Sequence, residues 1–158
     1  MDHSLPDRKH PIHLPILERG NRSNIVFVTV CSKDRKPIFA RSDVHDLLVS
    51  TWISAETWAV GRYILLPDHI HLFCSPADID VSLQKWIQYW KSRASTFWPR
   101  KHEHPIWERH FWDRQLRSGE SYDDKWDYVR NNAVRHGFAA SAEEWPFCGE
   151  LNQLGWLD

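Results

Sequence analysis

Two apolar segments separated by only two residues constrain the fold more than any other feature of this chain. Residues 57–66 (TWAVGRYILL) and 69–75 (HIHLFCS) are rich in the β-branched, aromatic and other apolar residues that favour strands. Pro67 and Asp68 between them form a tight turn. Because strands joined so closely must pair antiparallel, this hairpin predicts an antiparallel sheet.

The segments around the hairpin predict the rest of the sheet and two helices. Residues 25–31 (IVFVTVC) predict a buried strand, and residues 110–117 a fourth strand with imperfect alternation. Apolar residues at helical spacing predict one helix that Ser42 caps and a second helix over residues 81–98. The order β-α-β-β-α-β fits an α+β fold, a ferredoxin-like antiparallel sheet with both helices on one face.

A further helix follows the sheet. Ser121 and Asp124 have the spacing of a capping box, and Gly137 provides a stop signal. Its buried stripe is expected to consist of Tyr122, Trp126, Val129 and Ala133. Tyr128 lies off that stripe and is therefore expected on the polar side of the helix.

The length and composition predict one domain, residues 1–158, in the cytoplasm. We expect residues 1–22 to form an irregular arm and residues 138–158 a tail that packs back on the body. No apolar run reaches the roughly 18 residues that a membrane span needs, and the N-terminus lacks the apolar core of a signal peptide. The three cysteines have no CxxC spacing, so we expect reduced, mostly buried thiols: Cys31, Cys74 and Cys148.

Charge and aromatic content favour a nucleic-acid partner despite a net charge of −1. Between Val81 and Arg117 there are eight Lys and Arg residues against three acidic ones, whereas residues 118–158 are acidic. Such a polarised surface can bind through its basic face. Ten tryptophans are more than a core of this size needs, so some are expected to provide platforms for bases.

A His-x-His pattern lies in the predicted strand 69–75. Residues i and i+2 of a strand point to the same side, so His69 and His71 project together, while Ile70, Leu72 and Cys74 point towards the helices. Two adjacent imidazoles make a half-site for a divalent cation. The alternative is a polar stripe that merely faces solvent.

Tyr128 lies one helical turn from both Asp124 and Asn132 and close to Arg135. A tyrosine on the polar side of a helix, beside an amide that can bind a metal, can serve as a nucleophile. The alternative is a half-exposed surface tyrosine without a chemical role.

At LLPDHIHLF the sequence resembles the HUH-type single-strand endonucleases, and more narrowly the one-tyrosine transposases of the IS200-like class. It is most similar to the REP-associated tyrosine transposases, which act on repetitive extragenic palindromes. The segments VFVTVCSKDRKPIF, IWERHFWDRQLRS, YDDKWDYVRNNAVRHGF and EEWPF resemble further motifs of the family in the same order. The resemblance extends from about Ile25 to Phe147.

The resemblance implies an enzyme of DNA transposition and recombination. His69, His71 and Asn132 would hold Mg²⁺ or Mn²⁺, and Tyr128 would attack single-stranded or hairpin DNA to give a 5′-phosphotyrosine intermediate. The chain departs from the family in its low charge and in having Asn132-Ala133 where Asn-Pro is common. Alanine is expected to let the helix continue where proline would end or kink it.

The basic segment supplies candidate DNA contacts, namely Lys91, Arg93, Arg109, Trp112, Arg114 and Arg117. Two other functions remain open: a metal-dependent nuclease that uses activated water, and a non-catalytic nucleic-acid-binding descendant. Members of the resembled class act as monomers or as homodimers, and we expect a monomer.

Overall fold

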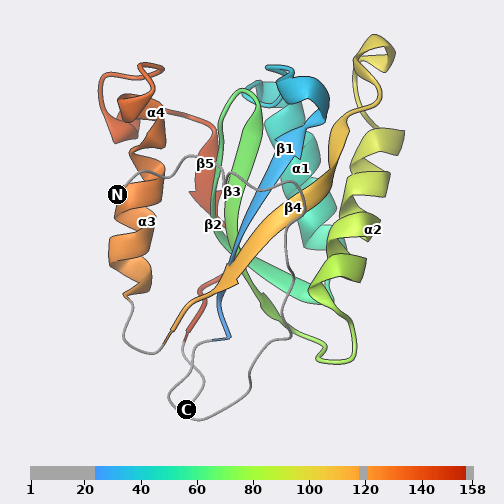
Figure 1. Cartoon of the computed structure of the whole chain (residues 1–158), viewed down its shortest axis with the longest axis vertical. Helices are drawn as coiled ribbons and strands as arrows, with labels where there is room; N and C mark the ends of the chain where they lie inside the picture. Colours follow the sequence, from blue (N-terminus) through green and yellow to red (C-terminus); the bar gives the residue numbers. More distant parts are fainter. Residues whose placement is uncertain (1–23, 118–120, 156–158) are drawn as a thin grey trace.

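The computed structural model describes residues 24–117 and 121–155, so the predicted arm at residues 1–22 lies outside the described residues. One antiparallel sheet of five strands divides these residues into two layers of helices (Figure 1). Its strands, in the spatial order β4-β1-β3-β2-β5, are β1 (Val26–Ser32), β2 (Trp58–Leu65), β3 (His69–Pro76), β4 (Trp107–Gln115) and β5 (Cys148–Glu150).

Helices cover both faces of the sheet. The helices α1 (Ser42–Ser54) and α2 (Leu83–Thr96) lie on one face, as predicted, and α3 (Tyr122–Arg130) and α4 (Asn132–Arg135) lie on the other (Figure 1). Three short 3₁₀ turns complete the described elements: η1 (Lys33–Arg35), η2 (Lys101–Glu103) and η3 (Ala142–Glu144).

The main core lies between the sheet and the helices α1 and α2. Alternate residues of β1 and β3 enter it, including Val28 and Leu72, which are opposite each other in the strand register. Trp86 and Trp90 from α2 are fully buried there. Several of the ten tryptophans are thus core residues, and their rings pack edge-to-face or stacked.

A second core lies between the other sheet face and α3. Phe73 contacts Tyr122, with ring centroids 4.9 Å apart, and Trp126, at 6.4 Å. Val129 and Ala133 are fully buried in the same cluster. The predicted apolar stripe of this helix therefore faces the sheet.

Several boundaries differ from the sequence-based expectation. Ser42 is the first helical residue rather than the cap, which is Arg41. Strand β4 begins at Trp107, three residues before the predicted strand, because it pairs with β1 through a bulge between Val30 and Ser32. The C-terminal tail contributes β5, an edge strand paired with β2 that its short length did not reveal.

The predicted continuous last helix was wrong. Ser121 caps α3 by accepting a hydrogen bond from the Asp124 amide, as predicted, but α3 ends at Arg130 and α4 begins at Asn132. Asn131 separates them with φ −79° and ψ 0°. Ala133 was expected to let the helix continue, but the helix is already interrupted at Asn131, before Asn132 and Ala133.

The three cysteines are free thiols, with Cys31 and Cys74 buried and Cys148 half-buried, in agreement with the expectation. Among the described residues, no helix combines the length and the apolar character needed to cross a membrane.

Candidate functional site: a histidine pair under the tyrosine helix

His69 and His71 project from β3 on the sheet face that α3 and α4 cover. Their ring centroids are 4.8 Å apart and the rings are nearly perpendicular. Both residues are buried, with exposures of 8% and 2%. The expectation that the two imidazoles project together holds, but they lie in an interior layer rather than on an open surface.

Each imidazole is held through its Nδ1 atom. His71 Nδ1 is 2.9 Å from the hydroxyl of Thr29, its cross-strand neighbour on β1. His69 Nδ1 is 2.7 Å from the Asp68 carboxylate. Phe27 stacks on the His71 ring at 5.2 Å. When Nδ1 donates such a bond, Nε2 carries the lone pair that a metal binds.

Asp68 is itself oriented by a second residue. Its Oδ2 accepts a hydrogen bond of 3.0 Å from Arg35 Nε, while Oδ1 contacts His69. Burial alone would raise the pKa of this carboxyl, but the hydrogen bonds from His69 and Arg35 outweigh it and lower the pKa to about 2. The carboxylate is therefore ionised at neutral pH.

Helix α3 packs on the sheet face from which the histidines project. Near its start, Tyr122 contacts Phe73 and accepts a hydrogen bond from the Arg62 amide. With a rise of about 1.5 Å per helical residue and about 3.4 Å per strand residue, Asn132 comes level with the segment His69–His71. In Figure 1, α4 and the turn between β2 and β3 lie at the same end of the sheet.

Tyr128, Asn132 and Arg135 form one contact group at the junction of α3 and α4. Arg135 lies over the Tyr128 ring, with its guanidinium carbon 4.0 Å from the ring centroid. Its Nη2 donates to Asn132 Oδ1 at 2.9 Å and to the Tyr128 carbonyl at 2.8 Å. Tyr128 is half-buried, which fits the expected position on the polar side of the helix and leaves both alternatives for this residue, nucleophile and surface tyrosine, open.

The residues present fit a divalent cation held by two imidazoles and an amide. Asn132 is 1% exposed, its Oδ1 accepts from Arg135, and its Nδ2 finds no hydrogen-bond partner within the described part of the chain. Oδ1 is the amide atom that could bind a cation, whereas the unpaired Nδ2 is a donor that suits an acceptor such as a phosphate oxygen. No group of three His, Cys, Asp or Glu side chains suited to a metal occurs among residues 24–117 and 121–155.

Two of the six predicted DNA contacts share the face of the histidines. The register pairs Trp112 with Thr29, and Thr29 with His71, so the three side chains lie in one row across the sheet. Arg114 pairs with Phe27, which stacks on His71, and is exposed. These two residues extend the site towards the β4 edge.

The other predicted contacts lie elsewhere. Arg93 is exposed on α2, behind the sheet, and Arg109 is exposed in the bulged part of β4, while Arg117 is exposed beyond the end of that strand. Lys91 corrects the expectation: it is buried, its Nζ donates to the Glu108 carbonyl at 2.8 Å, and it presents no charge to solvent. Burial lowers its pKa to about 8.

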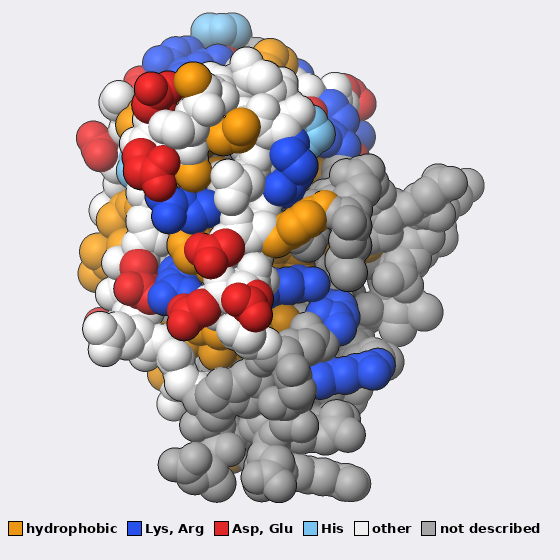
Figure 2. Space-filling view, turned by 90° about the vertical axis from the view of Figure 1, so that its left-hand side faces the viewer, with side chains coloured by type: hydrophobic (Ala, Val, Ile, Leu, Met, Phe, Trp, Pro, Cys, Tyr) orange, Lys and Arg blue, Asp and Glu red, His pale blue; other side chains and the backbone are white. Residues whose placement is uncertain are grey.

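On the outer side of α3 and α4, acidic side chains are interleaved with Lys and Arg side chains (Figure 2). This face belongs to the segment that the sequence showed to be acidic, and an excess of negative charge disfavours contact with a phosphate backbone. The exposed acidic residues are Asp123, Asp124, Asp127, Glu143 and Glu144.

Sequence reasoning missed the residues that orient the histidines. Asp68 was interpreted only as a turn residue, and Arg35 and Thr29 had no role. Adjacency of Asp68 to His69 was the one signal available. Nothing in the sequence placed Arg35, from a loop 33 residues earlier, beside them.

Comparison with known proteins decides the family. The chain matches the family model described as "Transposase IS200 like" over residues 22–132. The chain belongs to the IS200-like transposase family. The matched segment includes both histidines, the tyrosine and Asn132.

Named relatives agree with this assignment. A Haemophilus influenzae protein assigned as a REP-associated tyrosine transposase is 23% identical over 139 residues, which cover 80% of this chain and 79% of the relative. The REP-associated tyrosine transposase of Escherichia coli K12 is 26% identical over 89 residues, covering 56% of this chain and 52% of the relative. The family resemblance seen in the sequence is thus confirmed.

Solved structures share the fold. A REP-associated tyrosine transposase bound to a REP hairpin superposes with a TM-score of 0.66 at 19% identity, covering 92% of this chain and 82% of that chain. A Deinococcus radiodurans structure described as a transposase gives a TM-score of 0.51 at 14% identity, covering 78% of this chain and 98% of that chain.

Proposed function

We propose that this transposase cleaves and rejoins single-stranded DNA at hairpin-forming palindromic repeats, using Tyr128 as the nucleophile. The observation that carries the proposal is that α3 packs on the same sheet face from which the paired imidazoles of His69 and His71 project. The helix of Tyr128 and the histidine pair thus share one face in a member of the IS200-like family.

The fold supports this arrangement. The strand order β4-β1-β3-β2, with α1 and α2 on one face, fits a ferredoxin-like sheet. The sheet face opposite α1 and α2, which carries His69 and His71, would then be the metal-binding face. Helix α3 would be an addition to the ferredoxin-like sheet that carries Tyr128. The solved relative with a TM-score of 0.66 holds a REP hairpin, which supports hairpin DNA as the partner.

His69, His71 and Asn132 would hold the cation, and Mg²⁺ or Mn²⁺ is proposed. Bound there, it would polarise the scissile phosphate and offset charge on its oxygens. Two neutral nitrogens are a weak set for a hard cation, which leaves positions open for phosphate oxygens.

The reaction is a phosphoryl exchange at the Tyr128 hydroxyl. The Tyr128 oxygen attacks phosphorus, its bond to phosphorus forms, and the bond to the 3′ oxygen of the leaving strand breaks. The phenol proton leaves and the departing 3′ oxygen gains one, so a 5′-phosphotyrosine and a 3′-hydroxyl result. A 3′-hydroxyl can reverse the step and rejoin strands, because the bond energy is kept in the intermediate.

Trp112 and Arg114 are proposed as the DNA contacts nearest to the site. An indole offers a stacking surface to any base, and an exposed guanidinium can pair with phosphate. Their place in one row with Thr29 and His71 leads the strand from the β4 edge to the histidines. Arg109, in the bulge of β4, and Arg117, beyond the end of that strand, are exposed and are proposed as more distant contacts.

The test is an adduct assay with the full chain. Labelled single-stranded hairpin DNA, taken from palindromic repeats beside the gene, is incubated with Mn²⁺, and denaturation-resistant protein–DNA adducts are counted. We expect an adduct that is lost in Tyr128→Phe and in His69→Ala. Tyr89→Phe, which alters an exposed tyrosine of α2, is the matched control and should form the adduct normally.

The other outcomes identify the rival functions. Cleavage without an adduct that survives Tyr128→Phe would indicate a nuclease that activates water. Hairpin binding that is indifferent to chelators, with neither cleavage nor adduct, would indicate a binding-only descendant.

A further inference from the structure

The turn that follows β1 has a backbone conformation that its residues do not favour. Asp34 and Arg35 in η1 have φ values of 57° and 55°, in the left-handed region, although neither is glycine. Side chains with a Cβ atom are strained there, and two such residues in succession persist only where the surroundings impose them. Such an outlier is a reason to ask what the turn achieves.

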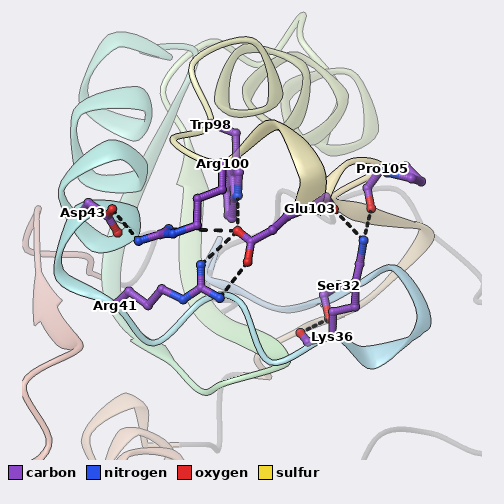
Figure 3. Close-up of polar contacts among 8 residues, drawn as sticks. All are labelled: Ser32, Lys36, Arg41, Asp43, Trp98, Arg100, Glu103 and Pro105. Carbon is purple, nitrogen blue, oxygen red and sulfur yellow. Dashed lines mark hydrogen bonds and ion pairs between the residues drawn. The ribbon is translucent and has the colours of Figure 1, made fainter.

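A polar network holds this turn on the loop before β4 (Figure 3). The Lys33 amide donates to the Ile106 carbonyl at 2.8 Å, and Lys36 Nζ donates to the carbonyls of Glu103 and Pro105. Ser32 Oγ donates to the Lys36 carbonyl at 2.7 Å. These contacts fix both ends of the strained pair.

The Glu103 side chain anchors the loop in turn. Its carboxylate accepts two hydrogen bonds from Arg41, at 2.7 and 2.9 Å, and one from Trp98 Nε1 at 2.9 Å. Arg100 also approaches it and pairs with Asp43 at the start of α1 (Figure 3). The turn thus rests on a rigid frame.

The side chain that the turn delivers is Arg35. Its Nε meets Asp68 Oδ2 at 3.0 Å, and the other oxygen of that carboxylate contacts His69 Nδ1 at 2.7 Å. The Arg35 and Asp68 side chains are 47% and 30% exposed. An ion pair this exposed adds little to stability, so it does not by itself account for two strained residues.

We infer that Arg35 and Asp68 are positioning residues that fix His69 as the Nδ1–H tautomer, with Nε2 directed at the cation. The inference rests on the proposed function, because it assigns these residues to the proposed metal site. Arg35 orients the carboxylate, and the carboxylate accepts the imidazole N–H. Partners of this kind set the tautomer and the ring orientation of a metal-binding histidine.

The first test reads the tautomer in the metal-free protein. Long-range ¹H–¹⁵N spectra distinguish the two nitrogens of each histidine ring, and His69→Gln assigns the His69 signals. We expect the Nδ1–H form of His69 in the wild type, retained in Asp68→Asn, whose amide oxygen still accepts, and lost in Asp68→Ala. An unchanged tautomer in Asp68→Ala would overturn the inference.

The second test measures Mn²⁺ affinity by calorimetry or by paramagnetic resonance of free Mn²⁺. Loss of such a partner weakens metal binding roughly 10–100-fold, which we expect for Asp68→Ala. Arg35→Gly removes the guanidinium but supplies the residue that the turn favours. It should weaken Mn²⁺ binding by a smaller factor without lowering the melting temperature.

Asp34→Gly is the matched control, because it relieves the same strain and keeps Arg35. We expect it to bind Mn²⁺ as the wild type does. A fall in melting temperature with unchanged Mn²⁺ affinity in Arg35→Gly would show a purely structural pair and overturn the inference. If the wild type binds no Mn²⁺, the proposed metal site fails, whereas an Asp68-dependent tautomer would still support the positioning role.

Discussion

Arg135 lies over the ring of Tyr128 at 4.0 Å and donates a hydrogen bond to Asn132 Oδ1 at 2.9 Å. One guanidinium thus contacts both the proposed nucleophile and the proposed amide ligand. Arg135 lies in α4, three residues after Asn132, so one helical turn carries both the Asn132 amide and the guanidinium that orients it.

Removal of Arg135 should slow adduct formation. A cation–π contact is worth about 0.5–2 kcal/mol and a hydrogen bond to a charged group about 1.5–3 kcal/mol. If about 1.4–2.8 kcal/mol of this is lost from the transition state, Arg135→Ala reduces the rate roughly 10–100-fold. The time course of the Mn²⁺-dependent adduct measures this. Arg130→Gln is the control, since Arg130 pairs only loosely with Glu143 at 3.5 Å. Equal rates for both variants would contradict the role.

Trp112 should contribute more to DNA affinity than Arg93 does. Base stacking on an aromatic side chain is worth about 1–3 kcal/mol, so Trp112→Ala should weaken single-strand binding roughly 10–100-fold. Arg93 lies on α2 behind the sheet, and Arg93→Gln should have little effect. Fluorescence anisotropy at two salt concentrations tests this. A larger loss for Arg93→Gln would place the DNA on the other face.

The buried Lys91 should make stability depend on pH in the alkaline range. Burial lowers its folded pKa from 10.5 to about 8, so between these values the unfolded state binds more protons and the free energy of unfolding rises with pH. The slope from this group is at most about 1.4 kcal/mol per pH unit. Lys91→Met removes the rise.

Urea unfolding of both proteins at pH 7.5 and pH 9.5 measures the Lys91 contribution. Burial raises the pKa of Cys31 to about 11, which opposes the trend in both proteins. The difference between wild type and Lys91→Met is therefore the quantity to compare. A difference that is the same at both pH values would refute the prediction.

Glu103 should stabilise the fold above pH 4.5 and lose this effect in acid. Hydrogen bonds from Arg41, opposed by burial and aided by Trp98, lower the pKa of its carboxyl from 4.5 to about 2. Its stabilisation is complete above the unfolded value and disappears as pH falls towards 2. We expect Glu103→Gln to lower the free energy of unfolding by about 1.5–3 kcal/mol at pH 7.

Urea unfolding at pH 7 and pH 3 tests the Glu103 prediction. The exposed Glu143, paired with Arg130, supplies the control Glu143→Gln, which should change stability by less than about 1 kcal/mol. Similar losses in the two variants would mean that the network in Figure 3 does not anchor the loop.

The sequence predicted what repeats at the period of a helix or strand. Strand alternation predicted that His69 and His71 share one face of the sheet. The apolar stripe with Val129 and Ala133 predicted the buried side of the helix, which packs on that face. Periodicity alone left Tyr128 open between a nucleophile and a surface residue. The family resemblance gave Tyr128 the expected role of nucleophile and Asn132 that of a metal ligand.

Other features depend on tertiary contacts that no local pattern contains. Lys91 has the spacing of a polar helix position, yet β4 covers it and its ammonium finds the Glu108 carbonyl. The bulge in β4 and the pairing of β5 with β2 are set by partner strands distant in sequence. Arg35 reaches Asp68 from a turn whose next residue, Lys36, is held by the carbonyls of Glu103 and Pro105.

The break at Asn131 places Tyr128 and Asn132 on separate helices. In one continuous helix, side chains four residues apart keep a fixed separation of roughly 6 Å, whatever the substrate requires. Here Asn131 lies between the two helices, so its two backbone torsions also set the separation of the Tyr128 and Asn132 side chains. Val129 and Ala133 are buried on either side of this joint, and Arg135 bridges it, so we expect the joint to hold that separation constant.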